Sequence, residues 1–295
     1  MPRPTASITG PAARQARRVA RYYKWLDRLS WFDERRAEEG HGALPVHRSL
    51  RDPAGGPPSP WVIHDLMLDG LSVPEAPRVL DAGCGYGATM LHLAPRLGGD
   101  WTGLTLSDVQ AARGNAQCAA QGLGDRVRVE VGSYDAPLPP ERFDLIYGIE
   151  SLIHSADPAA TIRNLGAALA PGGHLVIVDD MPVDEAMGEE PAARLACFRR
   201  YWRCPVAPTR SGWQQALRGA GLDVVAERDL NPLLLSRSMQ EVAGLLATVE
   251  RRSRLARLFG FGLRAEAEIG GLLLETLHAD GHMQYRVMAG RKPAG

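Results

Sequence analysis

Short apolar segments alternate with longer amphipathic ones through the middle of the chain. A short run rich in Val, Ile and Leu predicts a strand, and a run with few polar residues predicts a strand covered on both faces. The longer segments carry apolar residues at helical spacing, so the order of elements is typical of parallel βα units. The strands are predicted at 77–83, 100–107, 125–133, 143–151 and 171–182.

The alternation continues toward the C-terminus with one long interruption. Residues 213–230 predict a helix closed by glycine and then a strand, and residues 282–293 alternate in the way an edge strand does. Between them, residues 238–281 carry apolar positions at helical spacing with charges interleaved. This helical stretch is too long for a simple connection, so we expect it to cap part of the molecule. Upstream, residues 51–60 hold four prolines and two glycines and separate an N-terminal segment from the rest.

The composition suits a soluble protein of 295 residues, long enough for one large domain with an embellishment. The 34 basic and 34 acidic residues balance, so nothing points to nucleic acid or an anionic membrane as partner. The absence of a membrane-length apolar run or a secretory core predicts a cytoplasmic protein. Residues 1–26 are basic without an acidic residue, which fits either an arm leading into a helix or a transit peptide. We expect free, mostly buried thiols at Cys84, Cys118, Cys197 and Cys204.

Three glycines follow the first predicted strand, in the stretch RVLDAGCGYGATMLHLA at 78–94. Glycines at the exit of a buried strand allow a tight turn and let a ligand approach the main chain. A nicotinamide dehydrogenase would need G-x-G-x-x-G and an acidic residue at the end of the second strand. This chain has G-x-G-x-G preceded by Asp81, and Thr105 at the position of the acid. A dehydrogenase is therefore the disfavoured alternative.

The stretches VLDAGCGYG and LTLSDVQAARGN resemble motif I and its sequel in class I S-adenosylmethionine (SAM)-dependent methyltransferases. The resemblance covers roughly residues 60–235. YGIESLIH looks like the fourth-strand segment of the sterol and tocopherol branch, and the tail EIGGLLLETLHADGHMQYRVMAGRKP looks like that of prenyl diphosphate C-methyltransferases.

This resemblance implies an α/β fold: a Rossmann-like, seven-stranded, mostly parallel sheet flanked by helices, with an N-terminal helical lid and a helical insertion before the last strand. It divides the chain into a lid at 1–58, a SAM-binding core at 59–235, the insertion at 236–281 and the final strand of the core at 282–295.

The resemblance also implies the cofactor, SAM, with S-adenosylhomocysteine (SAH) as product. Asp81 would receive the amino group of SAM, the glycine turn would lie against its methionine part, and Ser133 and Tyr134 would bind adenine. At the second strand, Ser107 and Gln110 are expected to replace the usual ribose-binding acid, with Asp108 as the other candidate. The predicted cofactor contacts are Asp81, Gly83, Cys84, Gly85, Gly87, Thr105, Leu106, Ser107, Gln110, Ser133, Tyr134 and Glu150.

The catalytic candidates are Glu150 and His154, directly after the fourth predicted strand, and Tyr23 from the lid. His154 would act as the base if the acceptor atom is oxygen or nitrogen. If the acceptor is an alkene, methyl transfer creates a carbocation that the Glu150 carboxylate would stabilise. The lid concentrates aromatic rings, which can hold an apolar substrate and a passing cation or simply pack on the core. These rings are Tyr22, Tyr23, Trp25, Trp31 and Phe32.

The resemblance favours C-methylation of an isoprenoid-type alkene in secondary metabolism over O- or N-methylation of a natural product. A diphosphate substrate would need cations, for which Arg35, Arg36, His47 and Arg48 are the candidates. No metal-ligand spacing is present, so the metal considered is Mg²⁺ carried in by a diphosphate. The expected partner is a small molecule, without nucleic acid or membrane insertion, and the helical insertion is a candidate surface for homo-oligomers. The alternative of another class is a SAM-fold protein that binds without methylating.

Overall fold

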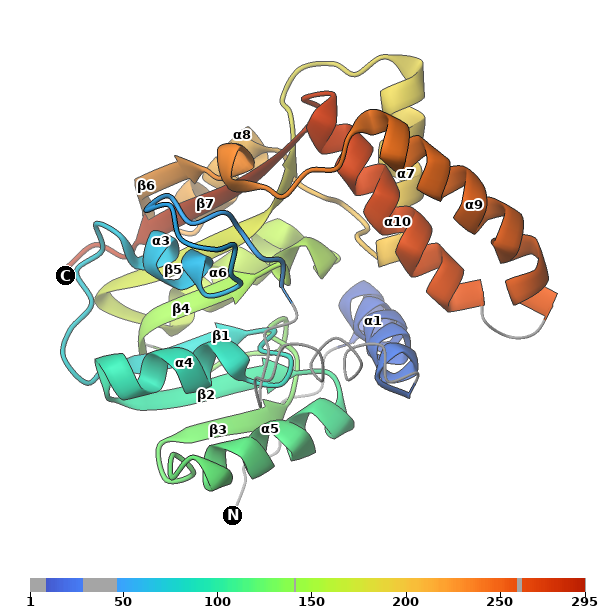
Figure 1. Cartoon of the computed structure of the whole chain (residues 1–295). Helices are drawn as coiled ribbons and strands as arrows, with labels where there is room; N and C mark the ends of the chain where they lie inside the picture. Colours follow the sequence, from blue (N-terminus) through green and yellow to red (C-terminus); the bar gives the residue numbers. More distant parts are fainter. Residues whose placement is uncertain (1–8, 29–46, 141, 259–261, 295) are drawn as a thin grey trace.

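The computed structural model describes residues 9–28, 47–140, 142–258 and 262–294. Within these ranges, seven strands form a single sheet in the order β3-β2-β1-β4-β5-β7-β6 (Figure 1). Strands β1 to β5 pair in parallel, and β7 runs antiparallel to both β5 and β6. The predicted seven-stranded, mostly parallel α/β sheet is therefore confirmed. The strands are β1 Arg78–Ala82, β2 Asp100–Thr105, β3 Val127–Val131, β4 Phe143–Ile149, β5 Leu169–Pro182, β6 Asp223–Asp229 and β7 Met283–Arg291.

Helices cover both faces of this sheet and extend beyond one end of it (Figure 1). Short 3-10 helices η1 and η2 follow β4 and β6. The α-helices are α1 Gly10–Arg28, α3 Val62–Leu68, α4 Ala88–Leu97, α5 Asp108–Ala120, α6 Pro158–Ala168, α7 Glu189–Trp202, α8 Arg210–Gly219, α9 Met239–Leu258 and α10 Gly262–Ala279, and the 3-10 helices are η1 Leu152–His154 and η2 Asn231–Leu233.

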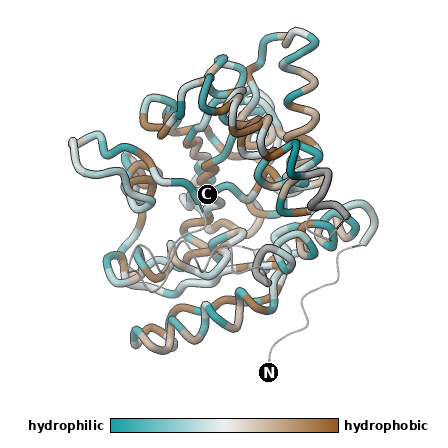
Figure 2. Tube along the Cα trace, turned by 45° about the vertical axis from the view of Figure 1, so that its right-hand side comes forward, coloured by the Kyte–Doolittle hydropathy of each residue, from teal (hydrophilic) through white to brown (hydrophobic). Residues whose placement is uncertain are grey.

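Alternate residues of the central strands point to opposite faces, and each face carries its own apolar core. On one face, Val79 and Tyr147 pack with residues of α3 and α4 such as Met67 and Met90. On the other, Leu80 and Ile146 pack against α6 and α8; that core also contains the fully buried indole of Trp213. Burial on both faces explains why these strands read as nearly continuous apolar runs. Figure 2 shows hydrophobic and hydrophilic residues alternating along the surrounding helices, as amphipathic packing requires.

The prediction that the last strand lies at an edge is wrong, because β7 lies between β5 and β6. The alternation of polar and apolar residues in β7 suggested one solvent-exposed face, but the side chain of Arg286 faces charged side chains of β6 instead. Arg286 is 13% exposed and faces Glu227 at 3.9 Å and Asp229 at 4.0 Å on β6. A neighbouring strand of opposite charge thus replaces solvent at these positions.

Helices α7, α9 and α10 form a third cluster beyond the sheet, and α1 lies beside α10 (Figure 1). The sequence prediction found α9 and α10 within residues 238–281 but assigned no helix at α7. Helix α10 approaches α7 closely at Gly270, where a Cβ would stand 2.4 Å from Trp202 Cδ1. Trp202 Nε1 donates to the carbonyl of Ala267 at 3.0 Å, which fixes the two helices together. Within the described residues, no helix is long and apolar enough to cross a membrane.

Candidate active site

The glycine turn connects β1 to α4 at the carboxyl end of the sheet. Gly83, Gly85 and Gly87 have φ angles of 99°, 55° and 79°, in the left-handed region that glycine adopts without strain. A Cβ on Gly83 would stand 2.5 Å from the Cβ of Ser151. The amides of Gly83 and Cys84 both donate to Leu104 O, at 3.0 and 2.9 Å, which ties the turn to β2. None of the described side chains caps the N-terminus of α4, which suits the binding of a ligand by its first amides.

Asp81 lies at the base of this turn and is 4% exposed. Burial raises its pKa to about 7, although the hydroxyl of Tyr147, donating to Asp81 Oδ2 at 3.0 Å, acts in the opposite direction. Among the described residues, no basic side chain forms an ion pair with this carboxyl group. A buried carboxyl group without a cation suits a ligand ammonium, so the residues present fit the amino-acid end of SAM.

The residues predicted at the end of β2 come together, but they bind one another. Thr105 Oγ1 donates to Gln110 Oε1 at 2.7 Å and accepts the amide of Ser107 at 3.2 Å. Ser107 Oγ in turn accepts the amide of Gln110 at 3.2 Å and caps α5. Leu106 is partly buried between them. This mutual bonding holds the start of α5 in place, and the predicted ribose contacts remain predictions.

The predicted adenine segment follows β3. The hydroxyl of Tyr134 donates to Ser151 O at 2.8 Å, while Ser133 Oγ accepts the amide of Asp135 at 3.1 Å. Asn164, which the sequence prediction missed, donates from Nδ2 to Tyr134 O at 2.7 Å. Tyr134 is partly buried against the core that contains Trp213. It therefore serves packing and also contacts the segment that carries the catalytic candidates.

Ser151 joins the two halves of the site and was also missed by the sequence prediction. Its Oγ donates to Ala82 O at 2.6 Å, its side chain lies against Gly83, and its carbonyl accepts from Tyr134. These contacts hold the segment after β4 directly against the glycine turn. The signal was present, since Ser151 stands between Glu150 and His154 in ESLIH, but a serine there carries no chemistry of its own.

His154 and Tyr23 meet although 131 residues separate them. The hydroxyl of Tyr23 lies 3.1 Å from His154 Nε2. Burial lowers the pKa of His154 to about 4 and raises that of Tyr23 well above its ordinary value. Gln15 of α1 donates to His154 O at 3.1 Å, so α1 is bonded to this segment by two side chains. At neutral pH the pair consists of a neutral imidazole and a neutral phenol.

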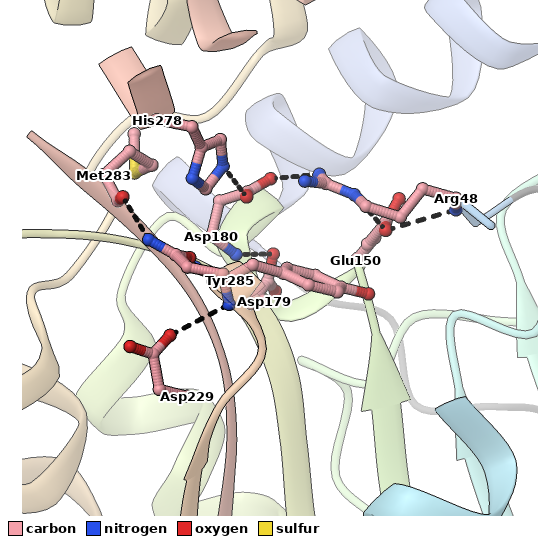
Figure 3. A network of polar contacts seen from close by, with 9 residues as sticks. Arg48, Glu150, Asp179, Asp180, Asp229, His278, Met283 and Tyr285 are labelled. Atoms are coloured by element: carbon pink, nitrogen blue, oxygen red, sulfur yellow. Dashed lines mark hydrogen bonds and ion pairs between the residues drawn. The ribbon is translucent and has the colours of Figure 1, made fainter. Parts of the chain in front are cut away.

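The second catalytic candidate, Glu150, has a φ of 51°, which is strained for a residue with a side chain. Its amide donates to Val178 O at 2.8 Å. Its carboxylate is bound by Arg48, whose Nε donates to Oε1 at 2.8 Å and whose Nη2 donates to Asp180 Oδ2 at 2.6 Å (Figure 3). His278 Nε2 lies 2.8 Å from the other Asp180 oxygen, Oδ1. Four chain segments thus meet around two carboxylates.

Two of the residues predicted to bind a diphosphate, His47 and Arg48, have other roles in the structure. Arg48 is paired with the two carboxylates, and burial lowers the pKa of His47, which leaves that imidazole uncharged at neutral pH. Arg35, Arg36, Trp31 and Phe32 lie outside the described residues. All four cysteines are free, with Cys118 and Cys204 buried and Cys84 and Cys197 partly buried. In the part of the chain that the structure describes, no cluster of His, Cys, Asp or Glu could hold a metal ion.

A glycine turn after β1, a buried carboxyl group beneath it and titratable side chains after β4 fit a ligand-binding and catalytic site at the carboxyl ends of a doubly wound sheet. The family comparison agrees, because the model of the methyltransferase domain matches residues 14–227. The chain belongs to this family and is a class I SAM-dependent methyltransferase. This also excludes the dehydrogenase alternative.

Individual relatives show the same relationship over different lengths. A probable chloroplastic tocopherol O-methyltransferase of Oryza sativa is 43% identical over 101 residues, 34% of this chain and 28% of the relative. Sterol 24-C-methyltransferase of Yarrowia lipolytica is 27% identical over 66% of this chain and 55% of the relative. The chain thus spans only part of these relatives.

One solved structure matches the fold along almost the whole chain. It is geranyl diphosphate C-methyltransferase of Streptomyces coelicolor A3(2) with Mg²⁺, geranyl diphosphate and SAH. It is 20% identical and has a TM-score of 0.69, over 96% of this chain and all of that one. This likeness extends to the fold outside the sheet.

Proposed function

We propose that the protein methylates carbon in a small, largely apolar metabolite, an isoprenoid-type alkene such as a prenyl diphosphate or a terpenoid. The observation that carries the proposal is the pair of carboxylates, Glu150 and Asp180, which Arg48 bridges at the carboxyl ends of β4 and β5. Ser151, the residue after Glu150, lies against Gly83 of the glycine turn. In this proposal the Glu150 carboxylate would stabilise positive charge on an alkene carbon after methyl transfer. Tyr22, Tyr23 and Trp25 form an aromatic cluster on α1, and in this proposal their rings would add cation–π stabilisation.

In this proposal the chain aligns donor and acceptor and removes a proton. SAM, when bound, supplies a methyl group already activated on sulfonium sulfur. The Asp81 carboxylate would hold the ammonium of the donor, and the glycine turn would admit its methionine part to the main chain. Neutral His154, bonded to Tyr23, would take the proton lost from the methylated acceptor. The N-terminal segment 1–58 and the insertion 236–281 would enclose the acceptor and exclude water.

The diphosphate is the weaker part of this acceptor assignment. The Streptomyces coelicolor structure holds Mg²⁺ and geranyl diphosphate together. In this chain, the two described candidates for binding a diphosphate offer no free positive charge, because His47 is uncharged at neutral pH and Arg48 is paired with Glu150. A diphosphate acceptor would therefore bring its own Mg²⁺ and rely on other cations. A terpenoid without a diphosphate needs neither.

Methylation of oxygen or nitrogen is the second candidate, and the Tyr23–His154 contact favours it. A buried imidazole with a pKa of about 4 is unprotonated at neutral pH, so its ring nitrogen can accept the proton lost from a hydroxyl or amine acceptor. The sequence relationship to a tocopherol O-methyltransferase supports the same assignment. A protein that binds SAM without methylating is the alternative of another class.

A calorimetric titration of the purified protein with SAM and SAH comes first. Incubation with methyl-labelled SAM and a panel of prenyl diphosphates, terpenoids, phenols and amines follows, with and without Mg²⁺. Label in a prenyl or terpenoid carbon supports C-methylation, and label only on oxygen or nitrogen selects the second candidate. Binding of SAM with no SAH formed over the whole panel would favour the non-catalytic alternative.

A further inference from the structure

Arg48 reaches the site from a backbone that is fixed on its C-terminal side. Leu50 is fully buried and forms antiparallel bridges with Ser59 and with Leu234, the residue after η2. The amide of Arg51 donates to Leu233 O at 2.8 Å. The segment that leads from the N-terminal region into the core is therefore anchored to η2 within three residues of Arg48.

The guanidinium of Arg48 holds two acidic residues from neighbouring strands at once. Its Nε, at 2.8 Å, and its backbone amide, at 3.3 Å, both donate to Glu150 Oε1, so Arg48 leaves Oε2 unengaged (Figure 3). Its Nη2 donates to Asp180 Oδ2 at 2.6 Å, and its Cζ lies 4.2 Å from the ring centre of Tyr285. A planar fork can make these contacts together, whereas a single ammonium cannot.

Arg48 balances the charge of the acidic residues around it. Burial by itself raises the pKa of Asp180, but Arg48 and then His278 bring it below the ordinary value, so this carboxyl group is ionised. Burial and the charge of Asp180 raise the pKa of the adjacent Asp179 well above its ordinary value. An anionic ligand at Arg48 would have to displace Glu150 or Asp180 from it. This argues against Arg48 as a phosphate-binding residue.

We propose that Arg48 is a positioning residue for methyl transfer, which orients the Glu150 carboxylate toward the acceptor by clamping it against Asp180. The inference rests on the proposed function of Glu150 at the acceptor. Strained backbone persists only where its surroundings hold it. The backbone of Glu150 is held by the bond from its amide to Val178 O, and its side chain is held by the bond from Arg48 Nε to Oε1.

The kinetic test compares Arg48→Gln and Arg48→Lys with the matched control Arg78→Gln. This control removes an arginine that pairs with Asp144 at the amino ends of β1 and β4, the edge of the sheet opposite the glycine turn. Displacing a catalytic group by about 1 Å can cost about 100-fold in rate. We expect Arg48→Gln to lower kcat about 100-fold, measured with the acceptor that the labelling panel identifies. The Kd for SAM should change less than about twofold. Arg48→Lys restores part of kcat because it keeps the charge but not the fork.

The pH profile separates positioning from a general loss of structure. Without Arg48 the pKa of Asp180 rises, so the acid limb of kcat/KM moves to higher pH in Arg48→Gln but stays near wild type in Arg48→Lys. A kcat for Arg48→Gln equal to that of Arg78→Gln would overturn the proposal. If Arg48→Gln does not fold, Arg48→Lys decides, and an unchanged kcat in that variant overturns it equally.

A second experiment tests the position of Glu150 without measuring activity. In crystal structures of wild type and Arg48→Lys, we expect the Glu150 carboxylate to leave its position against Asp180 in the variant. If it keeps the wild-type position, the clamp is refuted whatever the activity. If the wild type forms no SAH with any acceptor, the proposed function fails, and this comparison still decides whether Arg48 positions Glu150.

Discussion

Replacing Asp81 by Asn should stabilise the protein and abolish its binding of SAM. The wild-type carboxyl group is buried, and within the described residues it has no basic side chain as ion-pair partner. Its side chain accepts a hydrogen bond from the hydroxyl of Tyr147. Asparagine keeps an oxygen that can accept this bond and removes the need to bury a charge. It also removes the carboxylate on which the ammonium of SAM would depend.

The magnitude and its pH dependence follow from the pKa. The pKa of Asp81 is raised by burial from 3.8 to about 7, and each pKa unit corresponds to about 1.4 kcal/mol, so ionisation opposes folding by about 4 kcal/mol at pH 8. Because the folded-state pKa is the higher one, the penalty is absent below about pH 4, grows between pH 4 and 7, and is complete above pH 7. At pH 5 it amounts to about 2 kcal/mol.

Urea unfolding of wild type and Asp81→Asn at pH 8 and pH 5 measures these differences without ligand. We expect the variant to be more stable by up to about 4 kcal/mol at pH 8 and by about half as much at pH 5. Calorimetry with SAM should show no binding to the variant. For the wild type, affinity should fall as the pH drops below 7, because the carboxyl group must ionise to bind. A variant no more stable than wild type at pH 8, or one that still binds SAM, would refute the reasoning.

Three further substitutions test the turn and the base. Gly83→Ala puts a Cβ 2.5 Å from that of Ser151 at a φ of 99° and should lower stability by about 1–3 kcal/mol or more and abolish SAM binding. Its control is Gly221→Ala, with a φ of 74° and no atom within 4 Å, which should keep SAM binding. Gly85→Val should lose SAM binding and retain a cooperative unfolding transition, and undiminished affinity would contradict the role of the turn. His154→Gln should lower transfer to an oxygen or nitrogen acceptor by about 100-fold or more. In wild type its limb of the kcat/KM profile should lie near pH 4, with the base active above it; a limb near pH 6.5 would show that His154 is not buried in the working enzyme.

Local pattern was enough for the order of elements and for the cofactor turn. A strand covered on both faces must be apolar along its length, and a helix on the sheet must be apolar on one side, so periodicity marked β1 to β5 and the helices between them. Gly83, Gly85 and Gly87 were also recognisable, because a positive φ after a strand leaves few other choices of residue. These features depend on neighbours close in the chain.

Contacts between distant segments could be decided only by the tertiary structure. The pairing of β7 with β6 places acidic side chains of β6 beside the partly buried Arg286, whereas the periodicity of β7 alone suggested an edge. Tyr23 meets His154 across 131 residues, and Arg48 meets Asp180 across 132. Each residue type fits an exposed surface equally well when the sequence is considered alone. The sequence therefore determined which segments are strands and where SAM is expected to bind. Packing determined which side chains come together beyond β4 and β5, because such contacts depend on where helices and strands meet in space.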